Sequence, residues 1–208
     1  MGDLVRSEHT TDRAKLHERF NEAVRAANHQ HRHQIVSPLT ITLGDEFQGL
    51  SRTLGASLKI VQQIRWALLK DGIECRFVIG LAELSTPINT EIAWNMMGHG
   101  LARAREKLGQ KREANAYRFS LPDDPTIESL MDAVGLSVTD IESEWTPRQR
   151  EIALRSLEQP DRSAALIKAF DVKESVFYKV RRAAKYDLYQ TLMGCLSQTL
   201  AVLDEETA

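Results

Sequence analysis

Cysteine is scarce in this chain: only Cys75 and Cys195 occur among the 208 residues, and there is no CxxC pair. Disulfide frameworks and structural zinc sites need several cysteines at short, regular spacings. The composition therefore argues against both. Because Cys75 lies in an apolar, β-rich segment, we expect it to belong to the core.

Long apolar runs are also lacking. No stretch approaches the ~18 apolar residues of a membrane-spanning helix, and the first residues do not have the basic and then apolar pattern of a secretion signal. We therefore expect a cytoplasmic, bacterial-type protein with no membrane partner. Apolar residues still make up 42% of the chain, which is enough for a packed core and argues against disorder.

Net charge is small, at −2, and predicts no general attraction to nucleic acid. The charge is unevenly distributed, however. Between Trp145 and Asp187 ten Lys or Arg side chains stand against six Asp or Glu. This local excess favours an anionic partner for the C-terminal part of the chain.

The pattern of apolar residues divides the chain into elements. It predicts helices at about 11–28, 54–69 and 90–108, and strands at about 2–5, 35–43, 47–51, 74–84 and 115–121. Pro122-Asp123-Asp124-Pro125 then marks a boundary, after which every pattern is helical, including the segments 163–170 and 174–203. We therefore predict two domains, 1–121 and 126–208.

Trp145-Thr146-Pro147-Arg148-Gln149 has the features of a helix start, because Thr146 can cap the helix and Gln149 completes a capping box. We expect Asp161 to cap the next helix and Asp171-Val172-Lys173 to form the turn into the last one. For the small core of these helices the spacing favours Leu166, Ile167, Phe170, Val172, Val176 and Val180.

The segment 39–50 reads as strand, turn and strand, and its turn carries the adjacent carboxylates Asp45 and Glu46. Another acid, Asp3, lies near the start of the chain. Two carboxylates at strand ends, far apart in sequence, are a common way for a sheet to hold a divalent cation against a triphosphate. Alternatively, Gly44-Asp45 is simply a good hairpin turn. Arg76 has Glu74 and Glu83 as candidate ion-pair partners.

This order of strands and helices resembles the ferredoxin-like palm of class III nucleotidyl cyclases and GGDEF domains. The resemblance implies an α+β protein with an antiparallel sheet, in which Asp3 and Asp45 bind Mg²⁺ or Mn²⁺. Around them, Gly44, Glu46, Arg103 and Arg105 are candidates for contacts with a nucleotide and its phosphates. In the alternative interpretation, the two arginines lie on a solvated helix face. Leu43 replaces the first Gly of the GGDEF signature.

A closer resemblance covers nearly the whole chain. Gly2-Asp3-Leu4-Val5-Arg6-Ser7, the Gly-Asp-Glu-Phe-Gln-Gly segment 44–49, Arg76-Phe77-Val78-Ile79-Gly80 and the segment 102–106 are similar to the SatD family of small bacterial proteins, which has no settled biochemical activity. In this fold the first strand is central, and most of its apolar body would precede Met1. We therefore expect the natural start to lie upstream or the sequence to be a fragment.

Residues 146–185 resemble a helix-turn-helix of the kind found in sigma factors and response regulators. The resemblance implies that the third helix enters the major groove of double-stranded DNA. The residues that would face the DNA are Lys173, Ser175, Tyr178, Lys179 and Arg182. Ile167 and Asp171 depart from the pattern, since a small residue and a glycine are usual there. The alternative is a packing or dimerisation module, and the last helix either forms the seam of a homodimer or packs on the sheet.

Two functions from different classes are consistent with these residues. The first is a DNA-binding transcriptional regulator whose palm senses a ligand or dimerises. The second is a metal-dependent nucleotide-binding or cyclase-like enzyme, for which the sequence identifies no catalytic residue. A non-catalytic interaction module is the third alternative.

Overall fold

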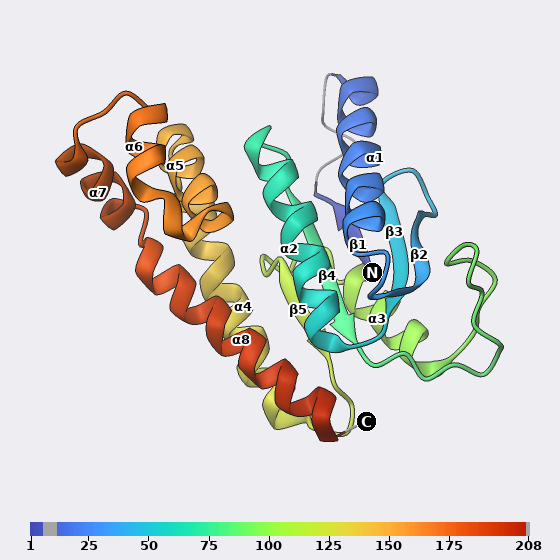
Figure 1. Ribbon diagram of the computed structural model, residues 1–208. Coiled ribbons are helices and arrows are strands. Elements are labelled where there is room, and N and C mark those ends of the chain that lie inside the picture. The colour runs from blue at the N-terminus through green and yellow to red at the C-terminus, as the bar shows by residue number, and fades with distance from the viewer. Residues whose placement is uncertain (6–11, 207–208) are drawn as a thin grey trace.

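The structure is a computed structural model that describes residues 1–5 and 12–206. The protein is α+β, with one sheet, helices on both of its faces, and a C-terminal helical part beside it (Figure 1). The elements are β1 (Gly2–Leu4), α1 (Arg13–Gln30), β2 (Ile35–Ile41), β3 (Glu46–Ser51), α2 (Leu54–Lys70), β4 (Cys75–Gly80), α3 (His99–Gly109), β5 (Tyr117–Ser120), α4 (Pro125–Glu144), α5 (Pro147–Glu158), the 3₁₀ turn η2 (Pro160–Arg162), α6 (Ser163–Ala169), α7 (Glu174–Ala183) and α8 (Tyr186–Glu206).

The five strands lie in the order β2-β3-β1-β4-β5, so the three-residue β1 is central. Asp3 of β1 is paired with Glu46 of β3 on one side and with Arg76 of β4 on the other, both in antiparallel register. The prediction of a wholly antiparallel sheet is wrong at one edge, where β5 runs parallel to β4. The reason is the connection through α3, which returns the chain across the sheet before β5 begins.

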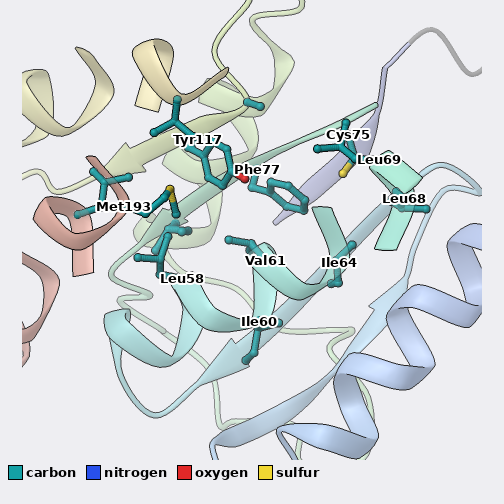
Figure 2. Packing of buried hydrophobic residues seen from close by; sticks show 14 of the residues in the cluster. Leu58, Ile60, Val61, Ile64, Leu68, Leu69, Cys75, Phe77, Tyr117 and Met193 are labelled. Atoms are coloured by element: carbon teal, nitrogen blue, oxygen red, sulfur yellow. The ribbon is translucent and has the colours of Figure 1, made fainter. Parts of the chain in front are cut away.

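The main core lies between the sheet and the helices α1, α2, α4 and α8, and Figure 2 shows the side chains of α2 meeting those of β4 and β5. A row of rings crosses the sheet from Phe20 through Phe47 and Phe77 to Tyr117, with neighbouring ring centroids 6.0, 6.0 and 6.3 Å apart. Burial of such large apolar surfaces is the main favourable term in folding. As predicted, Cys75 is buried in this core.

The centre of the sheet requires a residue without a side chain. A Cβ atom on Gly2 would lie 2.6 Å from the ring of Phe47 and 2.7 Å from that of Phe77. Both contacts are too close for real atoms, so the two rings close over the glycine backbone. Successive residues of a strand point to opposite faces of the sheet, so the side chain of Asp3 lies on the face opposite to these rings.

That opposite face is covered by α3 and by the irregular segment 81–98. The predicted helix 90–108 is wrong in its first half, because α3 begins only at His99. The side chain of Asn89 accepts hydrogen bonds from the backbone N–H groups of Glu91 and Ile92, and Asn95 has a left-handed φ of 57°. Asparagine favours such turns over helix interiors. The segment is held to the sheet by Gln48, whose amide donates to the carbonyl of Ala93.

The helical part packs on the sheet through α4, which lies against β5, while α8 packs against α4 and α2. The buried residues of both helices belong to the same apolar cluster as the sheet core. The predicted single helix 174–203 is wrong, because Lys185 adopts a left-handed φ of 52° and separates α7 from α8. The carbonyl of Ala184 accepts a hydrogen bond from the indole of the buried Trp145 at 2.8 Å. The break allows both Phe177 and Tyr186 to be buried. None of the helices in the described residues is long and apolar enough to span a membrane.

Candidate functional site

The first candidate site is formed by α5, η2, α6 and α7. The predicted capping box is confirmed, since Thr146 and Gln149 exchange hydrogen bonds at the start of α5. The predicted cap by Asp161 is wrong: this residue lies within η2, and the N-terminus of α6 has no side-chain cap. Between α6 and α7, Asp171 adopts a left-handed φ of 50°, the conformation that a glycine would take most readily.

A small apolar core holds these helices together. Ile152, Leu166 and Phe177 are buried at its centre, and Ile167, Phe170, Val172 and Val180 pack around them. The prediction that Val176 belongs to this core is wrong, because its exposed fraction is 43% whereas that of Phe177 is 0%. Residues three apart share a helix face and adjacent ones do not. The buried face of α7 is therefore the one that carries Phe177 and Val180. The sequence pattern assigned Val176 to this face in place of its neighbour Phe177.

The opposite face of α7 is polar and exposed. Ser175, Tyr178, Lys179 and Arg182 lie on this face, and Lys173 is exposed at the N-cap. At about 100° per residue, the four positions fall within roughly one third of the helix circumference. No ion pair with another described residue engages Lys173, Lys179 or Arg182. The face therefore presents positive charge that the protein itself does not neutralise.

Arg181 has a different role from its neighbours. Its guanidinium carbon lies 3.8 Å from the ring centroid of Tyr186 and 5.9 Å from that of Phe177. Its side chain is mostly buried, and a nitrogen lies 3.7 Å from a carboxylate oxygen of Asp187. Cation–π contacts of this kind fasten α7 to the start of α8. Arg181 is thus part of the scaffold of the exposed face.

The second candidate site, which we call the acidic corner, consists of Asp3, Asp45, Glu46 and Arg76. Both oxygens of Asp3 accept hydrogen bonds from Arg76, from Nε and from Nη2, each at 2.7 Å. The two side chains are buried, with exposed fractions of 4% and 7%. Arg76 therefore pairs with an acid 73 positions away in the sequence, and the candidate partners Glu74 and Glu83 were wrong.

The hairpin tip lies directly beside β1, since the carbonyl of Asp45 accepts a hydrogen bond from the backbone N–H of Leu4 at 2.9 Å. The pKa of Arg76 is raised by its hydrogen bonds with Asp3 and by the negative charges of Asp3, Glu46 and Asp45, against the opposing effect of burial. The structure thus brings the three acids around one guanidinium.

The described residues contain no group of three metal-ligating side chains. A divalent cation would have to displace the guanidinium of Arg76 to reach Asp3, so the metal-binding role of Asp3 and Asp45 stays a prediction. Arg6 and Ser7 of the N-terminal motif lie outside the described residues. Gly44, with φ of 80°, makes the turn at the hairpin tip.

The two candidate phosphate-binding arginines, Arg103 and Arg105, lie on α3. Arg103 forms an ion pair with Glu83 at 3.1 Å. Arg105 donates to the side-chain oxygen of Gln48 on β3 at 3.2 Å, and so helps to hold the segment 81–98. A cleft lies beside the acidic corner, and neither arginine is among the described residues that line it.

That cleft was not predicted from the sequence. Its volume is about 540 Å³, and it lies between the acidic corner, the turn before β5 and the outer side of α4. Its lining includes Asp45 and Arg76, whose guanidinium donates to the backbone carbonyl of Lys111 at 3.1 Å, and also the side chains of Lys111 and Arg112. Among the described residues, neither of the last two side chains has an ion-pair or hydrogen-bond partner. Its lining also includes acids, among them Glu113 and Asp140.

A buried polar network joins the sheet to the helical part. Glu142 of α4 accepts hydrogen bonds from Arg65, Tyr117 and Tyr189, each at 2.8 Å. Burial and the charge of Glu142 raise the pKa values of both tyrosines well above 10, so that they remain donors. Sequence reasoning missed this network. The available signal was a charged residue on the apolar face of each of two helices, at Arg65 and Glu142.

A family model for the SatD family matches residues 1–189, and the chain belongs to this family. No curated protein and no solved structure shows significant similarity to it.

Proposed function

We propose that this SatD-family protein binds double-stranded DNA through a helix-turn-helix formed by α5, α6 and α7, with α7 as the recognition helix. The single observation that carries the proposal is the exposed face of α7. Lys179 and Arg182 lie there side by side with the hydroxyl groups of Ser175 and Tyr178. Lysine and arginine neutralise phosphates, arginine also reads guanine edges, and hydroxyl groups contact either.

The arrangement of the three helices supports the same proposal. A short tight turn around Asp171 joins α6 to α7, and the small core around Phe177 keeps α7 in place with its polar face outward. A recognition helix needs this rigid support, because the first helices of such motifs cross the phosphate backbone while the last enters the groove.

Charge gives an independent argument. The basic excess of the chain is concentrated in the segment 145–187, within a protein of net charge −2. A surface that merely packed against another helix would not need cations on its exposed side, whereas binding to DNA depends on them.

A direct test uses a fluorescein-labelled mixed-sequence duplex of about three helical turns and measures anisotropy at low salt. We expect Lys179→Ala and Arg182→Ala each to weaken binding, by roughly 1–3 kcal/mol where the side chain contacts a base. Lys59→Ala removes the same charge from the exposed side of α2 and is the matched control. Equal affinity in all four proteins would reject the proposal.

For the remainder of the chain we propose a ferredoxin-like palm related to cyclase and GGDEF domains, acting as a ligand-sensing or dimerisation unit. The strand order β2-β3-β1-β4, with α1 after β1 and α2 after β3, supports it. So does the position of the segment 43–47 at the hairpin between β2 and β3.

A second candidate function is binding of a nucleotide at the cleft beside the acidic corner. The observation that favours it is the 540 Å³ volume bordered by Lys111 and Arg112, whose charges are not neutralised by another described residue. Ligand pockets commonly have volumes of about 300–1,000 Å³. In such a cleft these cations would hold phosphates, while Arg76 keeps Asp3 neutralised.

Calorimetric titration with ATP and GTP, with and without Mg²⁺, tests this second function. We expect Lys111→Ala and Arg112→Ala to weaken nucleotide binding and Lys59→Ala to leave it unchanged. Absence of heat and of any thermal shift at millimolar nucleotide would contradict it. If the protein converts the nucleotide, and Asp45→Asn abolishes this turnover, the protein would instead be identified as the cyclase-like enzyme.

A further inference from the structure

Helix α8 lies at the edge of the molecule (Figure 1), and its outer side is unusually apolar for such a helix. The inner side buries Tyr189, Met193, Leu196 and Leu200 against the rest of the core. On the outer side Leu188, Cys195 and Val202 recur at seven-residue intervals. The exposed fractions of Leu188 and Val202 are 51% and 54%, and Cys195 is a free, exposed thiol. We call these three residues the α8 seam.

Charge is missing from the middle of α8. Between Leu188 and Leu203 there are sixteen residues and not one Asp, Glu, Lys or Arg. The exposed positions of α1, by contrast, are mostly charged, for example Arg13, Lys15 and Glu18. A helix face in contact with water normally carries charges, whereas apolar residues repeating every seven positions form one row along a helix, as at a helix–helix seam.

The two ends of α8 carry opposite charges. Around its start Arg181, Arg182 and Lys185 outnumber the acids Asp187 and Glu144, which pair with Arg181 and Lys185. At its end Glu205 and Glu206 follow Asp204, which accepts hydrogen bonds from the start of α2. A second copy of α8 laid antiparallel would bring the basic end of each helix to the acidic end of the other. A parallel pair would place the acidic ends together and be destabilised by repulsion. Between these ends the α8 seam carries no charged side chains, so no electrostatic repulsion opposes its contact with the seam of a second copy.

We infer that the protein forms a homodimer in which α8 pairs antiparallel with α8 of a second copy, about a two-fold axis near Cys195. Cys195 is close to the middle of the helix, with nine residues of α8 before it and eleven after it. In an isologous pair, a residue at the axis contacts its own counterpart. The two Cys195 thiols therefore lie next to each other across the interface.

The arrangement has a consequence that rests on the proposed DNA-binding function. α8 has 21 residues and is therefore about 30 Å long. An antiparallel pair places the two α7 helices at opposite ends of this length. Half-sites read by helix-turn-helix dimers are about 34–36 Å apart, so the dimer would suit a two-fold symmetric site. The dimer itself does not depend on DNA.

The test begins with the unaltered protein. We expect light scattering after size exclusion to give twice the chain mass at micromolar concentration. A short bis-maleimide should then join two chains through Cys195, and Cys195→Ala should abolish the product. Cys75 is buried and does not compete for the reagent. A monomer at all concentrations would overturn the inference, and so would a dimer that the reagent cannot link.

Variants of the seam give the matched comparison. Leu188→Glu and Val202→Glu should each shift the protein to the monomer, with a dissociation constant at least tenfold higher. Ser197→Glu adds the same charge to an exposed position of the same helix, roughly 160° around from Cys195, and should leave the dimer intact. Equal effects of all three would overturn the inference. The cross-linking experiment uses the unaltered protein, so its result does not depend on whether Leu188→Glu or Val202→Glu folds. Loss of DNA binding with the dimer intact would instead count against the proposed function alone.

Discussion

Glu142→Gln is the substitution that best probes how the helical part is held to the sheet. The exposed fraction of the Glu142 side chain is 0% and that of Arg65 is 5%, and their atoms are 2.8 Å apart. Glutamine keeps the shape of the side chain and removes its charge. The guanidinium of Arg65 then stays in the core with only the carbonyl of Cys75 as a further acceptor.

The expected cost is large. Removing one partner of a buried ion pair destabilises a protein by about 3–5 kcal/mol, because the other charge is left uncompensated. Typical folding stabilities are only about 5–15 kcal/mol. For a chain of this size each kcal/mol corresponds to about 2–4 °C in Tm. We therefore expect Glu142→Gln to lower Tm by roughly 6–20 °C.

Urea unfolding followed by circular dichroism measures this loss. Glu144→Gln is the control: it makes the same change two residues later in α4, where the ion pair with Lys185 is exposed and contributes about 0–1 kcal/mol. In Arg65→Gln/Glu142→Gln both charges are gone, and the double variant should lose less stability than the sum of the two single variants. A loss below 1 kcal/mol for Glu142→Gln, or strict additivity in the double variant, would refute the reasoning.

Further predictions concern a helix terminus, a buried thiol and the acidic corner. Asp204 accepts hydrogen bonds from the first two N–H groups of α2, at 2.6 and 2.9 Å; Asp204→Ala should cost about 0.5–2 kcal/mol in urea unfolding, and an unchanged midpoint would contradict this. Burial raises the pKa of Cys75 from 9.0 to about 12, so the folded state holds this proton more tightly than the unfolded state does. The resulting stability is fully present below pH 9 and is lost as the pH rises towards 12, at up to about 1.4 kcal/mol per pH unit; a flat stability profile between pH 8 and pH 10 would count against it. Arg76→Gln releases the carboxylate of Asp3 and should strengthen Mn²⁺ binding measured by calorimetry, whereas equal binding in both proteins would show that Arg76 does not compete with a metal.

Local signals in the sequence predicted local structure well. The capping box at Thr146 rests on hydrogen bonds within a few residues, and it occurs in the structure. The turn at Asp171 was also placed correctly, although the sequence does not show that its φ is positive. Such features depend on the chemistry of the segment itself.

Features set by tertiary contacts could not be read in the same way. The partner of Arg76 depends on which strands are neighbours, and Asp3 becomes adjacent only because β1 is inserted beside β4. The break at Lys185 has no glycine or proline that would indicate it, and it is stabilised by the indole of Trp145, which lies in the connection between α4 and α5. The cleft likewise arises where three distant segments meet.

The salt dependence of duplex binding tests the central claim most directly. If α7 neutralises phosphates, the logarithm of the association constant falls linearly with the logarithm of the salt concentration, by about 0.9 per phosphate contact. Removing both Lys179 and Arg182 should then reduce the slope by roughly 2, where each of them contacts one phosphate. Lys59→Ala should leave the slope unchanged. Failure to bind any duplex at low salt, or the same slope with and without the two side chains, would contradict the assignment of α7 as a DNA-contacting helix.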